Sequence, residues 1–159
     1  MKLRRSEHVE ELPRSSEAAF DLVHDYGRRL EWDTLLREAY IDGGEAPGVG
    51  AVAVCTGRWW LGGLCFRTAY VSFRRGEVAA VKLVNRPPFF ERWAASIRHE
   101  PLGAQRSRIV YTISFSARPR WLAWLLEPVI DLAFRIETRR RLSALRDALA
   151  QQAGRAGRR

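Results

Sequence analysis

RWLAWLLEPVIDLAFRIETRRRLSALRDALAQQ, residues 120–152, is the one long helical signal in a chain that otherwise reads mostly as strands. A helix over this whole stretch is ~48 Å long, which is longer than a small sheet is wide. From Trp121 to Ile136 the residues are apolar nearly all round, so we expect this half to be covered on more than one side. After the arginines that follow, the apolar residues hold only a narrow stripe, made by Leu142, Leu145 and Leu149.

A proline and two acidic residues limit the structures that residues 120–152 can form. Pro128 cannot donate a helical hydrogen bond, so we expect a kink, or a short helix to Leu126 followed by a longer one. Glu127 and Asp131 exclude a transmembrane span, which needs about 20 predominantly apolar residues. The simpler interpretation is a core helix. The alternative is that part of Trp121 to Phe134 covers a cavity or touches a membrane surface.

The size and composition indicate one globular domain. The chain has 159 residues, of which 47% are hydrophobic, and this is enough for a substantial core. We expect the domain to cover residues 1–152 and a basic, frayed tail to follow over residues 153–159.

The strong positive charge is only weak evidence for a nucleic-acid partner. The net charge is +9, and all but Lys2 and Lys82 of the 27 Lys and Arg residues are arginine. Such a charge suits anionic partners, but arginine in place of lysine throughout is also typical of a coding bias, which is the interpretation we prefer. Since no helix-turn-helix, zinc-finger spacing or aromatic RNA-binding motif accompanies it, we expect no specific nucleic-acid partner.

Cysteine and histidine are too sparse to indicate a redox or metal site. Cys55 and Cys65 form no CxxC motif, and His8, His24 and His99 lack a ligand spacing. We therefore predict neither a metal nor a cofactor. The basic start of the chain is not followed by the apolar segment of a signal peptide, so we expect a cytoplasmic protein.

Shorter elements precede the long helix. We predict a strand over Leu3–Leu12, a short helix capped by Ser15 or Ser16, a second helical turn over Arg28–Trp32, and a strand over Leu35–Ile41. Five strands separated by turn signals follow and form a meander: Val49–Trp60, Leu64–Arg74, Glu77–Asn85, Phe89–Glu100 and Arg106–Ala117.

The Gly62-Gly63 pair is typical of a two-residue hairpin turn, and it predicts a register for the strands on either side. Cys55 then lies opposite Tyr70, while Cys65 lies on the other face. The two cysteines are ~17 Å apart along the ladder, beyond disulfide reach.

Alternation divides the predicted sheet into an aromatic face that also carries small residues and a largely cationic face. A strongly bent antiparallel sheet around a long helix leaves space between them. Small side chains opposite large ones, such as Cys55 opposite Tyr70, indicate that this space is not completely filled. We predict a cavity lined by residues of the aromatic face and one tryptophan of the long helix: Trp59, Phe66, Thr68, Tyr70, Leu83, Trp93, Ile97, His99, Tyr111, Ile113, Phe115 and Trp124.

Four short segments carry a resemblance over nearly the whole chain: SSEAAFDLV at 15–23, EWD at 31–33, GVG at 48–50 and EPLG at 100–103. In their order and spacing the chain resembles the START-like, helix-grip superfamily, which includes polyketide cyclases/dehydrases and lipid-transfer domains. The resemblance implies an α+β fold in which a bent antiparallel sheet of about seven strands wraps around the C-terminal helix, with two short helices after the first strand. It also implies a hydrophobic ligand between sheet and helix, but no particular reaction.

Three hypotheses for the function follow. The leading one is a soluble binding or carrier protein for a lipid-like, polyketide-like or quinone-like molecule. The second is an enzyme of the cyclase/dehydrase type, in which Tyr70, Tyr111 and His99 polarise a carbonyl and move protons; a histidine at a strand end can instead simply bond a carbonyl or water. The third is a protein-interaction module that uses the basic surface. A homodimer contact through valines on the outer face and a peripheral membrane contact also stay open.

Overall fold

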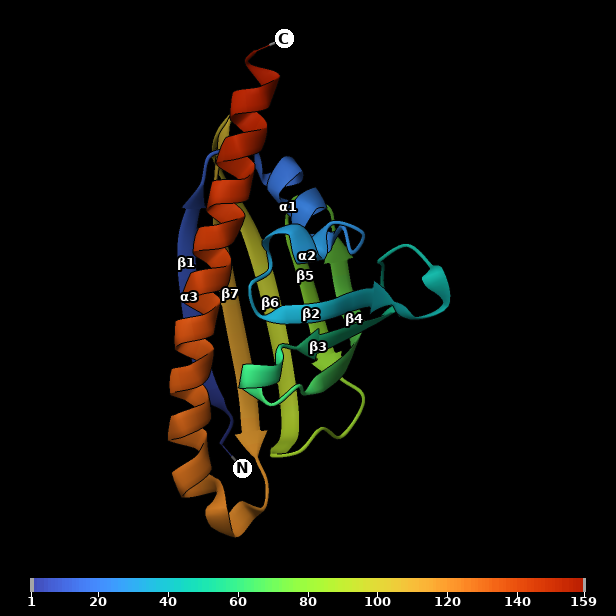
Figure 1. Ribbon diagram of the computed structural model, residues 1–159, viewed down its shortest axis with the longest axis vertical. Coiled ribbons are helices and arrows are strands. Elements are labelled where there is room, and N and C mark those ends of the chain that lie inside the picture. Colours follow the sequence, from blue (N-terminus) through green and yellow to red (C-terminus); the bar gives the residue numbers. More distant parts are fainter. Residues whose placement is uncertain (1, 159) are drawn as a thin grey trace.

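The computed structural model describes residues 2–158, in which an antiparallel sheet curves around a long C-terminal helix (Figure 1). The seven strands lie in the order β1-β7-β6-β5-β4-β3-β2, which confirms the predicted helix-grip fold. The elements, in chain order, are β1 (Arg4–Leu12), α1 (Ser16–His24), α2 (Arg29–Trp32), β2 (Leu36–Ile41), η1 (Asp42–Gly44), β3 (Val52–Gly57), η2 (Trp59–Leu61), β4 (Cys65–Arg74), β5 (Val78–Leu83), β6 (Phe90–Gly103), β7 (Arg106–Ala117), η3 (Arg120–Leu122) and α3 (Ala123–Ala156).

Helix α1 begins where the sequence predicts. Ser15 is the N-cap, and its side chain accepts a hydrogen bond of 3.3 Å from the backbone N–H of Ala18. The face that carries Ala19, Phe20 and Val23 is buried. Capping therefore sets the start of the helix, and its apolar face fixes it against the sheet.

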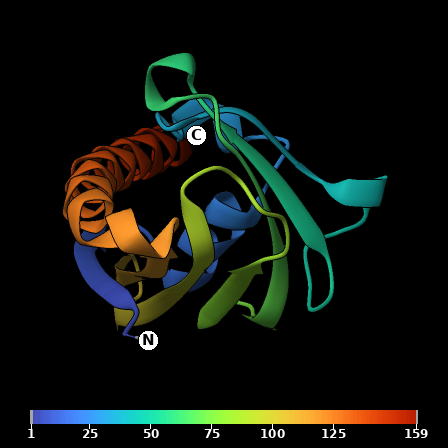
Figure 2. The ribbon, with the colours of Figure 1, turned by 90° about the horizontal axis from the view of Figure 1, so that it is seen from below.

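The pairing of β6 with β7 has the predicted parity. Trp93 lies opposite Phe115, and Ile97 lies opposite Tyr111. These side chains point to the concave face, which Figure 2 shows curving around the interior with α3 on one side. Because side chains alternate along a strand, the arginines between them, such as Arg98, point to the opposite face.

The predicted register between β3 and β4 is wrong by four residues. Gly62 and Gly63 do not form a two-residue hairpin turn, because the helical turn η2 takes up the chain before them, and Cys55 lies opposite Phe66 rather than Tyr70. The shift is an even number, so the paired residues Val52–Thr56 and Cys65–Ala69 keep their predicted faces. Cys65 pairs with Thr56, so the cysteines are diagonal neighbours and not ~17 Å apart.

A bulge modifies β4. Val81 lies opposite Tyr70, but the register shifts between Tyr70 and Ser72. Beyond the shift Phe73 pairs with Ala79 and points inward, where its ring lies 5.1 Å from that of Phe20. A bulge changes which residues face the core, so alternation alone could not place Phe73.

Helix α3 is continuous from Ala123 to Ala156, past the predicted end at Gln152. The short separate helix to Leu126 does not form; the turn η3 takes its place, and Pro128 lies inside α3. In the second half, Leu142, Leu145 and Leu149 are buried, as the narrow stripe predicts.

The first half of α3 is not covered on more than one side, contrary to the prediction. The sheet covers only one face of it, where Ile130 and Phe134 contact the core. The large apolar side chains of the other faces are exposed: Trp124, Leu125, Val129, Leu132 and Ile136, together with Trp121 in η3. None of the described helices has a stretch long and apolar enough to cross a membrane.

Candidate functional site

Two adjoining cavities lie between the concave face of the sheet and α3. The first, which we call the inner cavity, has a volume of about 70 Å³. Its walls come from α1, α2 and the segment between them, from β2 to β7 and from α3. They are formed by His24, Tyr26, Arg29, Leu35, Leu36, Cys55, Phe66, Thr68, Tyr70, Ala79, Val81, Trp93, Ala95, Ile97, Tyr111, Ile113, Phe134 and Arg141.

The second, the outer cavity, has a volume of about 180 Å³ and shares Leu35, Leu36, Phe66 and Phe134 with the inner cavity. Its other walls are formed by Gly57, Leu64, Phe89, Phe90, Ile130, Ala133 and Glu137, of which only the last is ionisable. The rings that the cavities share are held by aromatic contacts. Phe66 stacks on Trp93 with ring centres 5.4 Å apart, and Phe134 lies 5.9 Å from Phe90.

A chain of three side chains forms one polar wall of the inner cavity. The hydroxyl of Tyr70 lies 2.8 Å from Nδ1 of His24 and 2.8 Å from the hydroxyl of Tyr26. Burial raises the pKa of Tyr26 to about 12 and raises that of Tyr70 further. Burial also lowers the pKa of His24 well below its usual range, so at neutral pH the histidine is uncharged and both tyrosines are protonated.

An ion cluster forms the other polar wall. Asp33 is fully buried and accepts from Nε of Arg29 at 2.8 Å, and from Nε and Nη2 of Arg141 at 2.9 Å each. Burial raises the pKa of Asp33, but the charges of Arg141 and Arg29 outweigh it and hold the pKa below its ordinary value. The cluster joins α2 to α3 across 108 residues of sequence.

The two cysteines differ in their relation to the cavities. Cys55 lines the inner cavity, and burial raises the pKa of its thiol. Cys65 is next to it in the ladder but points to the opposite face. Both thiols are free. In the part of the chain that the structure describes, no three His, Cys, Asp or Glu side chains are grouped to hold a metal ion.

Seven of the twelve residues predicted to line a cavity do line the inner one: Phe66, Thr68, Tyr70, Trp93, Ile97, Tyr111 and Ile113. Three others are in the interior but border neither cavity. Phe115 contacts Phe134 in the core, Leu83 lies at the edge of the core, and His99 is buried with its ring 5.5 Å from that of Phe20.

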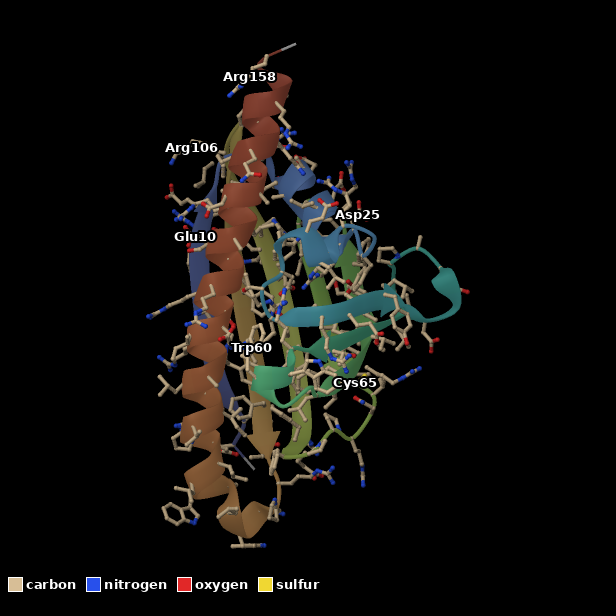
Figure 3. The ribbon with its side chains drawn as sticks, in the orientation of Figure 1. Glu10, Asp25, Trp60, Cys65, Arg106 and Arg158 are labelled. Carbon is tan, nitrogen blue, oxygen red and sulfur yellow. The ribbon has the colours of Figure 1, made fainter. Side chains whose placement is uncertain are left out.

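The remaining two predicted residues are tryptophans that lie outside. Trp59 is 76% exposed, with the guanidinium of Arg37 4.2 Å from its ring centre, and Trp124 is 75% exposed on α3. Figure 3 labels the next residue, Trp60, on the same short helix η2. Trp59 leaves the sheet because η2 ends the strand, and Trp124 lies on the face of α3 turned away from the sheet.

The sequence interpretation missed most of the polar lining. Arg29, Tyr26 and His24 lie in or next to short helices that were predicted only as structural elements, and Arg141 belongs to a run of arginines. One local signal was present, since Arg29 and Asp33 are four residues apart and form an ion pair. Arg141, the partner of Asp33 in α3, is too far away in the sequence for a local pattern to indicate the contact.

Comparison with known proteins agrees with this architecture. The model of the family described as polyketide cyclase / dehydrase and lipid transport matches residues 4–150. No curated protein sequence matches the chain.

Several solved structures are similar. The Zhui aromatase/cyclase from Streptomyces sp. R1128 has a TM-score of 0.78 at 15% identity, with 96% of each chain covered. A START superfamily protein from Mycobacterium smegmatis has a TM-score of 0.73 at 13% identity, covering 93% of this chain and 98% of that one. Norcoclaurine synthase from Thalictrum flavum, in complex with dopamine and hydroxybenzaldehyde, has a TM-score of 0.69 at 12% identity, covering 94% and 88%. At these identities the likeness extends to the fold alone.

Proposed function

Because the chain belongs to the polyketide cyclase / dehydrase and lipid transport family, we propose that it binds a small, largely hydrophobic molecule in the paired inner and outer cavities. The observation that carries this proposal is the arrangement of the two cavities. They share four apolar residues, so one elongated molecule can occupy both if the Phe66 and Phe134 rings turn aside. Its apolar part fits the outer cavity and its polar end fits the inner one, as in a lipid-like, polyketide-like or quinone-like molecule.

Filling the outer cavity with a side chain tests this proposal. Ala133 lines the outer cavity, whereas its neighbour Leu132 is 59% exposed. Ala133→Trp should therefore weaken binding of the neutral fluorescent probe Nile red by about tenfold or more, because the indole occupies the space. Leu132→Trp is the matched control and should leave the affinity unchanged.

The reverse pattern would contradict the proposal. If Leu132→Trp changes the affinity and Ala133→Trp does not, the probe binds the exposed face of α3 and the cavity is not the binding site. Melting temperatures of both variants, measured alongside, show whether either substitution disturbs the fold.

A second candidate function is an enzyme of the cyclase/dehydrase type, and the hydrogen-bonded chain of His24, Tyr70 and Tyr26 favours it. His99 is not part of this arrangement, since it borders neither cavity. In its place His24 can take up or release a proton through Tyr70, whose hydroxyl can polarise a ligand carbonyl. Tyr70→Phe should then abolish turnover of a poly-β-carbonyl thioester while Nile red still binds. Unchanged turnover would exclude this role.

The exposed apolar stripe of α3 supports a contact with an anionic membrane surface. Leu125, Val129, Leu132 and Ile136 follow one another at helical spacing, with exposed tryptophans before them and exposed arginines after them. The acidic residues of this half are engaged elsewhere: Glu127 accepts from the backbone N–H of Ala117, and Asp131 pairs with Arg135. A second copy of the chain is less suited to this face, because each carries a net charge of +9.

Vesicles provide the test of this contact. The chain should sediment with vesicles that contain phosphatidylserine and not with pure phosphatidylcholine, and Trp124→Ala should weaken the association. A stable dimer in solution that Trp124→Ala dissociates would instead show that a second copy covers the stripe. The protein-interaction hypothesis stays a prediction, tested by partners that remain bound at high salt.

A further inference from the structure

We infer that the ligand carries a carboxylate or a similar anionic oxygen group, and that Arg29 and Arg141 bind it in the inner cavity. This inference rests on the proposed function, since it states which polar end the hydrophobic molecule presents. It comes from the ion cluster, whose charges do not cancel.

The balance of charge around the inner cavity is positive. Two guanidinium groups share one carboxylate, because Arg29 and Arg141 both bond Asp33, which leaves a net charge of +1. The side chains are 6%, 10% and 0% exposed, in that order, so water screens this charge poorly. A buried charge without a counter-ion is costly, and a ligand anion would supply the missing one.

The other groups around the two cavities do not neutralise this charge. At neutral pH His24 is uncharged and both Tyr26 and Tyr70 are protonated, so these three side chains contribute polarity without charge. Glu137 lines the outer cavity, but its carboxylate already accepts a hydrogen bond of 3.0 Å from Arg140. The inner cavity is therefore the positively charged end of a binding space that is otherwise mostly apolar.

Both arginines also retain donors. Within the described residues, Arg29 uses Nε toward Asp33 and Nη1 toward the carbonyl of Val23, while Arg141 uses Nε and Nη2 toward Asp33. Nη2 of Arg29 and Nη1 of Arg141 remain for a ligand. Both side chains line the cavity and are held in place by aromatic rings, with Arg29 4.9 Å from the ring centre of Trp32 and Arg141 5.5 Å from that of Tyr111. Such fixed guanidinium groups suit the planar geometry of a carboxylate.

Displacement of Nile red by a matched pair of ligands tests the inference. Decanoate and 1-decanol have the same chain length and differ in the charge of the head group, which is ionised in decanoate at about pH 8. Wild-type protein should bind decanoate about tenfold or more tightly than 1-decanol. The preference should persist at about 0.5 M salt, which screens the exposed arginines much more than the buried pair.

Two substitutions in α3 test whether the ion cluster causes the preference for decanoate. Arg141→Gln should reduce the ratio of the two affinities to about one, whereas Arg139→Gln, which alters an exposed arginine of the same run, should leave the ratio unchanged. The ligand preference of the wild-type protein decides the question even if Arg141→Gln does not fold.

The outcomes separate the two proposals. Equal binding of decanoate and 1-decanol by the wild type would overturn the anionic ligand and leave the hydrophobic cavity standing. Failure of both ligands to displace Nile red would overturn the proposed function together with this inference.

Discussion

The two ends of α3 lie in contrasting surroundings. In the closed end, formed by α1, α2 and the part of α3 from Thr138 onward, apolar side chains are buried and the charges of Asp33 and Arg141 are paired. In the open end, formed by the part of α3 before Glu137 together with Phe89, most large apolar side chains are exposed. Figure 1 shows the closed end beside α1 in the upper part of the view. The difference indicates that burial at the closed end stabilises the fold, whereas the exposed apolar side chains of the open end contribute little to its stability.

The largest effect should come from the ion cluster of the closed end. Asp33→Ala leaves two buried guanidinium groups without a counter-ion, and we expect a loss of about 3–5 kcal/mol in the free energy of unfolding. Urea denaturation measures it. Glu10, labelled beside α3 in Figure 3, accepts from Arg146 at the surface, and Glu10→Ala is the control that should cost less than about 1 kcal/mol. Equal losses would show that the buried cluster has no special role.

A comparison of two leucines of α3 tests the two ends directly. Leu145 is fully buried, so Leu145→Ala should cost about 2–4 kcal/mol through lost contacts and a residual cavity. Leu132 lies in the open end and is 59% exposed, so Leu132→Ala should change the stability by less than about 0.5 kcal/mol. Thermal and urea unfolding of both variants measure the two losses in stability. Similar losses would contradict the difference between the closed and the open end.

The acid sensitivity of the fold should depend on two buried histidines, His24 of α1 and His99 of β6. Burial lowers the pKa of His99 to about 4, whereas the pKa of a histidine in the unfolded chain is about 6.5. Between these values the unfolded chain binds a proton that the folded chain does not, so stability falls as the pH falls from about 6.5 to about 4. The loss from this group amounts to up to about 3 kcal/mol.

Replacing the histidine isolates its share. His99→Leu should reduce the slope of stability against pH in this range, and His24, whose pKa burial also lowers, should keep part of it. The measurement is urea unfolding at a series of pH values. Identical slopes for the variant and the wild type would show that the pKa of His99 is not lowered in the folded protein.

The sequence allowed the fold and seven of the residues that line the inner cavity to be predicted, for reasons that particular residues illustrate. The shared face of Trp93 and Phe115 follows from alternation along each strand, and alternation is local information. The β3–β4 register was missed because two glycines with positive φ fit a tight turn as well as the end of η2. The ion cluster was missed because Arg141 meets Asp33 only in the folded chain.

The open end was missed for a different reason. An apolar pattern is compatible with burial of Trp124 and its neighbours in the core and with an exposed surface that contacts a partner. The pattern alone does not distinguish the two. Phe134 lies on the face of α3 that contacts the core, whereas Trp124 is 75% exposed. The predicted role of Trp124 as a cover over the cavity is therefore wrong.

The labelling rates of the two cysteines test the binding cavity most directly. Cys55 lines the inner cavity and Cys65 lies on the opposite face, so Cys55 should react with iodoacetamide more slowly than Cys65 in the free protein. Saturating 1-decanol should slow Cys55 further, by about fivefold or more, and leave Cys65 unchanged, as followed by mass spectrometry of the two peptides. If 1-decanol binds and the rate of Cys55 does not change, or both rates fall equally, the ligand does not occupy the cavity between the sheet and α3.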